Sequence, residues 1–190
     1  MKNNHKMEII VKDIPEEGLE LDFDAGRTPW FLQVLRDALG KQHAKEDRAQ
    51  GHLSLLRIGE NIDCEGRVEC DCHPTCCRCL KVFHHHLDVP VHQILAPLYE
   101  SERQLKLEQK EEVELVKEDL EFAYYENDRF DLGDMVREQI ILSLPLQPLC
   151  QEACKGLCPV CGKNLNEGPC QCKARDVQTR RIPLKAFKRG

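Results

Sequence analysis

Six cysteines gather between residues 150 and 172. They are spaced as Cys150-x3-Cys154-x3-Cys158-x2-Cys161, followed by Cys170-x-Cys172. Zinc favours thiolate ligands in a tetrahedron, and a C-x2-C turn directs two sulfur atoms at one point. The segment is too short and too polar to build a core of its own, so metal ligation would supply its folding free energy. We therefore predict that residues 150–172 fold around a structural zinc ion.

Four of these six cysteines would complete one site, and the spacing leaves the choice open. Cys158 and Cys161 are the safest pair, because Gly162 follows them where a knuckle needs an unhindered backbone turn. The second pair is either Cys150 with Cys154 or Cys170 with Cys172. A third arrangement places all six around two bridged ions. Four thiolates close the shell and leave no position for a catalytic water, although they accept iron as well as zinc.

An earlier group of cysteines lies between residues 64 and 79, with histidines close by in the sequence. Its members are Cys64, Cys70, Cys72, Cys76, Cys77 and Cys79. Cys76-x2-Cys79 again has ligand spacing, so we predict it as a weaker second metal site. The alternatives are a solvated strand with reduced thiols or a redox pair. Within the triplet at 84–86, His84 and His86 would share one face of a strand.

The composition indicates one ordinary domain of 190 residues, 41% of them hydrophobic. No stretch approaches the roughly 20 apolar residues needed to cross a bilayer, and residues 1–7 lack the apolar run of a signal peptide. We therefore expect a cytoplasmic protein with no membrane contact. In that reducing compartment the twelve cysteines would remain thiols that can bind a metal.

Charge is unevenly distributed along the chain. The formal net charge is −6, yet residues 173–190 carry +6, so the remainder carries −12. A basic tail can neutralise phosphates, although it can equally be a solubilising end. The candidate nucleic-acid contacts in this tail are Arg175, Arg180, Arg181, Lys185, Lys188 and Arg189.

The remaining pattern predicts an α+β body at 1–149, with an antiparallel sheet and two main helices. Two short strands are expected within 7–24, β structure from 51 to about 91, and a late strand near 120–124. Helices are expected after Thr28, ending at Gly40, and from Asp131 to residue 143. Turns are expected at 59–61 and 65–66. An acidic excursion near 100–118, a zinc knuckle at 150–172 and a basic tail at 173–190 complete the predicted organisation.

The run FDLGDMVREQIILSLPLQPLCQEACKGLCPVCGKNLNEGPCQC resembles the signature of the bacterial family called DUF177 or YceD. The CCRCL at 76–80 resembles a second, weaker motif of that family, and the order of elements agrees. The resemblance implies a role in the accumulation of large-subunit (23S) ribosomal RNA. It also implies contact with ribosomal RNA, a large-subunit ribosomal protein, or both. The histidine triplet and the extra cysteines (Cys64, Cys70, Cys72 and Cys77) depart from the usual family pattern.

No arrangement of residues indicates an enzyme or a small-molecule substrate. A Ser-His-Asp constellation cannot be argued, and GKNLNEG lacks the lysine position of a phosphate-binding loop. We therefore expect a non-enzymatic ribosome-biogenesis factor with structural zinc. The alternative is a thiol-based redox sensor or metal-responsive protein that uses the cysteine pairs.

Overall fold

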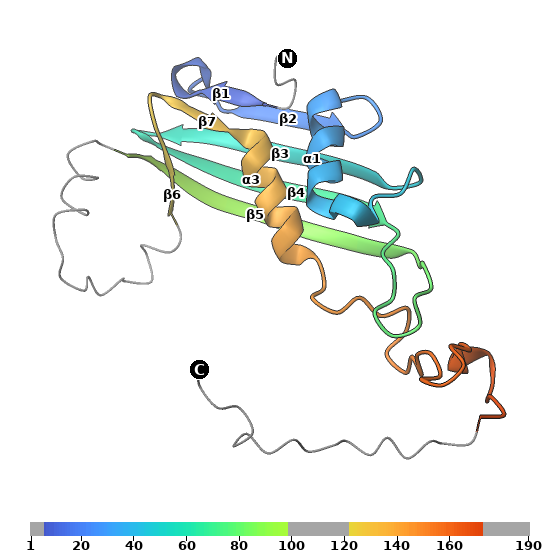
Figure 1. Ribbon diagram of the computed structural model, residues 1–190. Coiled ribbons are helices and arrows are strands. Elements are labelled where there is room, and N and C mark those ends of the chain that lie inside the picture. Colours follow the sequence, from blue (N-terminus) through green and yellow to red (C-terminus); the bar gives the residue numbers. More distant parts are fainter. Residues whose placement is uncertain (1–5, 99–121, 173–190) are drawn as a thin grey trace, which may run out of the picture.

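The fold is α+β, with a five-stranded sheet carrying two helices on one face (Figure 1). The computed structural model describes residues 6–98 and 122–172. The sheet has the order β2-β3-β4-β5-β6, and a separate pair joins β1 to β7. The strands are β1 (Glu8–Ile10), β2 (Leu19–Asp24), β3 (Arg48–Ile58), β4 (Asn61–Cys72), β5 (His85–Pro97), β6 (Phe122–Tyr125) and β7 (Arg129–Asp131). The helices are α1 (Pro29–Leu39) and α3 (Leu132–Ser143), with short 3-10 turns at Val11–Asp13, Gly40–Gln42 and Leu165–Glu167.

Both predicted helices are confirmed, and their ends follow from local chemistry. α1 begins at Pro29, whose fixed φ suits a first helical turn, and ends before Gly40 with its φ of 55°. The carboxylate of Asp131 accepts hydrogen bonds from the first backbone N–H groups of α3. Helical spacing of apolar residues then turns one side of each helix to the sheet, as Phe31 of α1 shows by packing edge-on against Phe23 of β2.

The long strands alternate between a face under the helices and a face turned away from them. On β4, the side chains of Ile62, Cys64, Val68 and Cys70 are fully buried, while Arg67 between them is exposed. Neighbouring strands keep this register, since Val68 pairs with Gly51 of β3 and with Val89 of β5. The hydrophobic core therefore lies between the sheet and the two helices.

Two expectations about the sheet need correction. The turn predicted at 65–66 is absent, because both residues lie inside β4 and Gly66 pairs with Leu53. A glycine is needed there because a Cβ would lie 2.1 Å from the carbonyl oxygen of His52. The sheet is also not wholly antiparallel, since β6 pairs with β5 in parallel.

The other β predictions are confirmed, including the two early strands, the late strand and the turn at 59–61. The acidic excursion near 100–118 and the basic tail at 173–190 lie outside the described residues. Within the described ranges, no helix is both long and apolar enough to span a membrane.

Candidate metal centres

Eight of the twelve cysteines form two groups of four, and in each group all sulfur atoms lie within 4.8 Å of one another. We call Cys76, Cys79, Cys150 and Cys154 the inner cluster. We call Cys158, Cys161, Cys170 and Cys172 the outer cluster. The inner cluster lies beside the end of the sheet, and the segment carrying the outer cluster extends beyond it (Figure 1). Each group could hold one metal ion.

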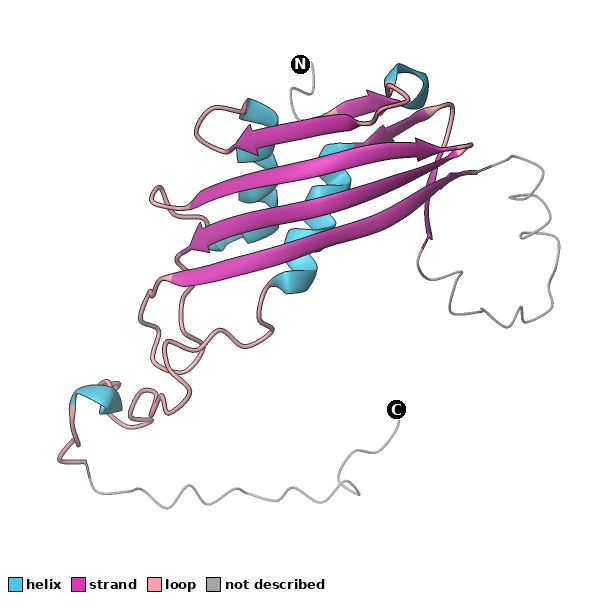
Figure 2. Ribbon diagram, turned by 180° about the vertical axis from the view of Figure 1, so that it is seen from behind, coloured by secondary structure: helices cyan, strands magenta, loops and turns pink. Residues whose placement is uncertain are grey.

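The inner cluster brings together two distant parts of the chain. Cys76 and Cys79 come from the loop between β4 and β5, whereas Cys150 and Cys154 follow α3. β4 and α3 end at the same end of the sheet, so the two segments run side by side (Figures 1 and 2). The sulfur atoms of Cys76 and Cys154 are 3.8 Å apart, and those of Cys79 and Cys150 are 3.5 Å apart.

These distances fit metal ligation better than a disulfide. Four thiolates at about 2.3 Å from a zinc ion lie roughly 3.8 Å apart along the edges of a tetrahedron. A disulfide would bring two sulfur atoms to about 2.05 Å. All twelve cysteines are free thiols in the structure. In the outer cluster the sulfur atoms of Cys158 and Cys170 are 3.4 Å apart, which again suits two ligands of one ion.

Hydrogen bonds also join the two segments that carry the inner cluster. The N–H of Cys77 donates to the carbonyl of Pro148 at 2.9 Å. The Arg78 guanidinium donates to the carbonyl of Cys154 at 3.1 Å, and the carbonyl of Arg78 accepts from the N–H of Leu157 at 3.2 Å. The two cysteine-bearing segments are therefore joined directly by hydrogen bonds of the residues between Cys76 and Cys79.

Asn166, which lies between Cys161 and Cys170 of the outer cluster, connects the two clusters. Its side-chain oxygen accepts from the N–H of Lys155 at 2.8 Å. Its side-chain nitrogen donates to the sulfur of Cys154 at 3.3 Å, so an outer-loop residue contacts an inner-cluster ligand. Hydrogen bonds of this kind orient a ligand and favour its thiolate form.

The C-x2-C turns of the two clusters share one backbone geometry. In the inner turn, the N–H of Leu80 donates to the carbonyl of Cys76 at 3.0 Å, and the N–H of Cys76 donates to Lys81 at 2.9 Å. In the outer turn, Gly162 donates to Cys158 at 2.9 Å and Cys158 donates to Lys163 at 2.8 Å. The residue after the second cysteine has positive φ in both turns, 58° at Leu80 and 73° at Gly162.

Each cluster contains a thiol whose pKa is strongly lowered. At Cys76, burial acts to raise the pKa of the thiol, but backbone N–H groups, including that of Cys150, lower it to about 6. At Cys158, the backbone N–H groups of Cys161 and Val160 lower the pKa of the thiol to about 6. The thiolate is the form that binds a metal ion, so the turns prepare these two sulfur atoms as ligands.

Three further cysteines, Cys64, Cys70 and Cys72, lie on the core side of β4 and belong to neither cluster. Burial raises the pKa of their thiols to about 12, 12 and 11, respectively. Such thiols form little thiolate at neutral pH and act as small apolar side chains. They are core residues and not the solvated thiols of the alternative interpretation.

The nearby histidines contact carboxylates. His84 Nε2 and His86 Nδ1 each lie 3.0 Å from Oδ1 of Asp71, so both rings turn to the same carboxylate. The strand predicted to carry both residues begins only at His85, so His84 precedes it. His73 Nδ1 lies 2.9 Å from Oδ1 of the buried Asp47. Neither cysteine cluster includes a histidine among the described residues.

The structure places the two pairs between residues 150 and 161 in different groups. Cys158 and Cys161 lie with Cys170 and Cys172, one of the two pairings considered. Cys150 and Cys154 lie with Cys76 and Cys79, a combination that the local spacing did not indicate. The basic residues of 173–190 lie outside the described part of the chain.

Comparison with known proteins identifies the family. The family model described as "Large ribosomal RNA subunit accumulation protein YceD" matches residues 64–188. The chain belongs to the YceD family. The match begins on β4 and includes all eight cysteines of the two clusters, so both clusters lie within the family region. No solved structure matches the chain.

Curated relatives share shorter stretches. A protein of Zea mays named "Large ribosomal RNA subunit accumulation protein YCED homolog 1, chloroplastic" is 45% identical over 49 residues, covering 25% of this chain and 17% of that protein. Its namesake in Arabidopsis thaliana is 38% identical over 42 residues, covering 22% and 13%. An uncharacterized protein of Mycobacterium leprae is 25% identical over 113 residues, covering 60% and 47%. The chain thus spans less than half the length of each of these relatives.

Proposed function

We propose that this YceD-family chain is a non-enzymatic ribosome-biogenesis factor that supports the accumulation of large-subunit (23S) ribosomal RNA. The observation that carries the proposal is the family match over residues 64–188, together with the names of the plant relatives. In this role the protein would act through contacts with ribosomal RNA, a large-subunit ribosomal protein, or both. The cytoplasmic location expected from the sequence stays a prediction.

In this proposal each cysteine cluster holds one structural zinc ion. Four thiolate ligands close a tetrahedral shell and leave no open position for water or substrate. The sulfur–sulfur distances of 3.4 to 3.8 Å support this assignment. The zinc at the inner cluster would hold the segment after α3 against the β4–β5 loop, so that both segments form one rigid end of the protein.

The closed shells favour this role over the thiol sensor. A redox sensor needs an accessible thiolate beside a second thiol with which it can form a disulfide. Cys76, Cys79 and Cys154 of the inner cluster are all buried, which limits the access of an oxidant. A metal ion held by all four sulfur atoms would restrict that access further.

The test is genetic. In the organism that encodes this chain, depletion of the protein is expected to lower 23S relative to 16S ribosomal RNA, and expression of the wild-type chain to restore it. Measurement of both RNAs by blotting and by sucrose-gradient profiles follows the effect to the large subunit. Unchanged 23S RNA after complete depletion would refute the proposed function.

A variant of the tail sharpens the same experiment. Replacement of Arg180, Arg181 and Lys185 by glutamine removes three positive charges and leaves the described fold untouched. If the tail contacts RNA, this variant should restore less 23S RNA than the wild type, and its RNA affinity should depend less on salt. Full restoration with unchanged RNA affinity would remove the tail from the proposal.

A further inference from the structure

One face of the five-stranded sheet has no described element packed on it. Figure 2 shows this open face in front, with α1 and α3 both behind the strands. Its residues are those that alternate with the core positions of β2, β3, β4 and β5. The strand register aligns them in rows, such as Asp22, His52 and Arg67, which are exposed neighbours on three adjacent strands.

The open face is strongly acidic. Its carboxylates are those of Glu20, Asp22, Asp24, Asp63, Glu65, Glu69, Asp71 and Asp88. On the same strands, the cations of the face are Arg48 and Arg67, and Arg67 already pairs with Asp88 at 2.6 Å. The acidic excess of the chain, which the sequence assigns to the body, is therefore concentrated in part on one uncovered surface.

Most of these carboxylates have histidines or amides as neighbours instead of permanent cations. His52 contacts Asp22 at 2.8 Å and Glu20 at 3.1 Å, and Gln50 donates to Glu69 at 2.8 Å. The hydrogen bond with Asp22 raises the pKa of His52 above its usual 6.5, a sign of the negative surroundings. A raised pKa favours the protonated ring, so His52 can offset one of the two charges of Asp22 and Glu20, and the excess negative charge stays on the face.

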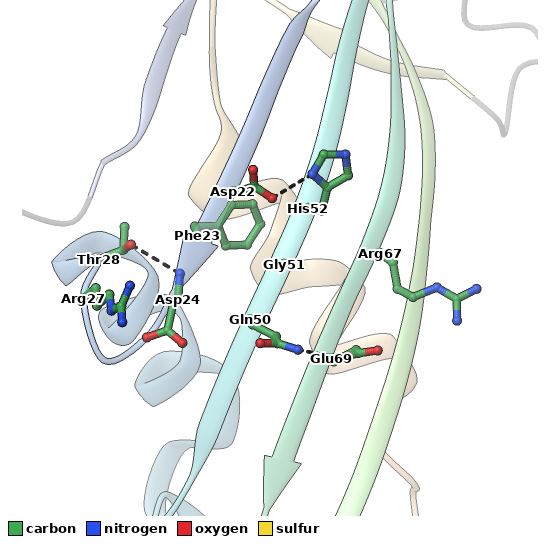
Figure 3. Close-up of a pocket in the computed structure, with 10 residues that line it drawn as sticks. All are labelled: Asp22, Phe23, Asp24, Arg27, Thr28, Gln50, Gly51, His52, Arg67 and Glu69. Carbon is green, nitrogen blue, oxygen red and sulfur yellow. Dashed lines mark hydrogen bonds and ion pairs between the residues drawn. The ribbon is translucent and has the colours of Figure 1, made fainter.

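A shallow depression lies on this face where β2, β3 and β4 adjoin the start of α1 (Figure 3). Its volume is about 680 Å³. Its lining residues are Asp22, Phe23, Asp24, Arg27, Thr28, Gln50, Gly51, His52, Arg67 and Glu69. Three carboxylates and two guanidinium groups, those of Arg27 and Arg67, line the depression with the polar side chains of Thr28 and Gln50. Arg67 is already paired with Asp88, so the carboxylates can accept the charged end of a long side chain.

Farther along the face, Asp63 offers a second type of contact. It lies between Leu56 of β3 and Ile94 of β5 in the strand register. Its Oδ1 is buried and accepts no hydrogen bond from the described residues, although His92 Nε2 lies 3.7 Å away. The Asp63 side chain is 28% exposed, so a lysine or arginine could lay its apolar stem on Leu56 and Ile94 and direct its charged end at the exposed part of this carboxylate.

We propose that the open face of the sheet binds a lysine- and arginine-rich segment of a protein partner. Charge complementarity carries the choice of partner, because the face would repel the phosphates of RNA and attract cationic side chains. The biological setting rests on the proposed function, in which a basic protein of the large subunit is the natural partner. RNA contact, if present, would then use another part of the chain.

The test measures binding of a fluorescein-labelled peptide with alternating lysine, arginine and apolar residues to the full-length, zinc-loaded protein. Fluorescence anisotropy is recorded at about 50 and 200 mM salt, since surface charge attraction weakens over that range. The face variant combines Asp22→Asn, Glu65→Gln and Glu69→Gln. The matched control combines Glu16→Gln, Asp37→Asn and Glu138→Gln, which removes the same charge from exposed positions off the open face.

The face variant is expected to bind the peptide roughly tenfold more weakly than the wild type, and the control within about twofold of it. Equal affinity of the face variant and the wild type overturns the proposal. So does peptide binding that appears only after Arg180 and Arg181 are neutralised, because the chain's own tail would then be the occupant. Circular dichroism of each variant shows whether the sheet is intact.

The single variants Asp63→Asn and Glu65→Gln sharpen the test, because both remove one charge from β4. Asp63→Asn should weaken peptide binding more, since Asp63 lies between the apolar Leu56 and Ile94, whereas Glu65 lies between Ser54 and His92. An equal or smaller effect contradicts the role given to Asp63. If the peptide tests fail but 23S RNA still falls when the protein is depleted, the proposed function stands and only the binding face is refuted. If 23S RNA does not fall on depletion, the proposed function is refuted whatever the peptide binds.

Discussion

The two cysteine clusters each contain four thiols and a C-x2-C turn, yet they bring together parts of the chain that lie at very different separations in the sequence. Cys76 and Cys154 of the inner cluster are 78 residues apart, whereas Cys158 and Cys170 of the outer cluster are 12 apart. A long loop costs more entropy to close than a short one, although the cost grows only slowly with length. A metal ion in the inner cluster would therefore fix tertiary structure, and one in the outer cluster would fix a local loop.

The difference extends to the contacts around the sulfur atoms. Backbone and guanidinium hydrogen bonds at Cys77 and Arg78 join the two halves of the inner cluster, and three of its four cysteines are buried. In the outer cluster Cys161 is exposed and Cys158 alone is buried. The segment that carries the outer cluster has fewer buried cysteines than the inner cluster. Its fold should therefore depend more completely on a bound metal ion.

Removal of metal should have the largest effect. Elemental analysis is expected to find two zinc ions per chain, and a strong chelator should remove both. Because structural zinc supplies folding free energy of order 10 kcal/mol per site in small knuckles, residues 148–172 should then become sensitive to protease. The sheet and its helices have their own core and should survive, as shown by far-ultraviolet circular dichroism. One zinc per chain, or a protease-resistant segment after chelation, would break the comparison.

Loss of one ligand should separate the clusters. Cys76→Ser should reduce the metal content to one zinc and release the segment at 148–157 from the β4–β5 loop, measured by hydrogen exchange of the amide of Cys77. Cys158→Ser should also leave one zinc but change exchange only within 158–172. Serine is a close match for cysteine in size, so packing changes little. Identical exchange patterns in the two variants would show that the clusters form one unit.

Much of the arrangement around the clusters could be predicted from the sequence, but their membership could not. The C-x2-C turns, the cap at Asp131 and the turn at Gly59 depend on neighbouring residues, and a single sequence displays them. The pairing of Cys150 with Cys79 depends on where β4 and α3 end in space, which no local pattern encodes. The turn predicted at Gly66 was wrong for a related reason. A glycine is needed at this position because the backbone of His52, on another strand, approaches closely, and not because the chain turns there.

The link between the clusters should give an intermediate effect. Asn166→Ala removes the hydrogen bonds to Lys155 and to the sulfur of Cys154. The loss is expected to be about 1–2 kcal/mol of local stability, because the N–H of Lys155 loses its acceptor. Faster zinc release to a chromogenic chelator from the inner cluster would show the coupling. Asn166→Asp keeps the acceptor for Lys155 but replaces the donor to Cys154 by a carboxylate that repels the thiolate, so it should also release zinc faster. Unchanged release in Asn166→Ala would mean that the clusters are independent.

The smallest effect is expected where the two turns differ, at the residue with positive φ. Leu80 is 62% exposed, so its side chain contributes little burial while its backbone has the left-handed conformation that disfavours any residue with a Cβ. Leu80→Gly should therefore stabilise the inner turn by up to about 1 kcal/mol, and Gly162→Ala should destabilise the outer turn by a similar amount. Thermal melting of the zinc-loaded protein measures the first, and protease sensitivity of 158–172 measures the second. If Leu80→Gly instead lowers the melting temperature, the leucine makes a stabilising contact that its exposure conceals, and the equivalence of the two turns fails.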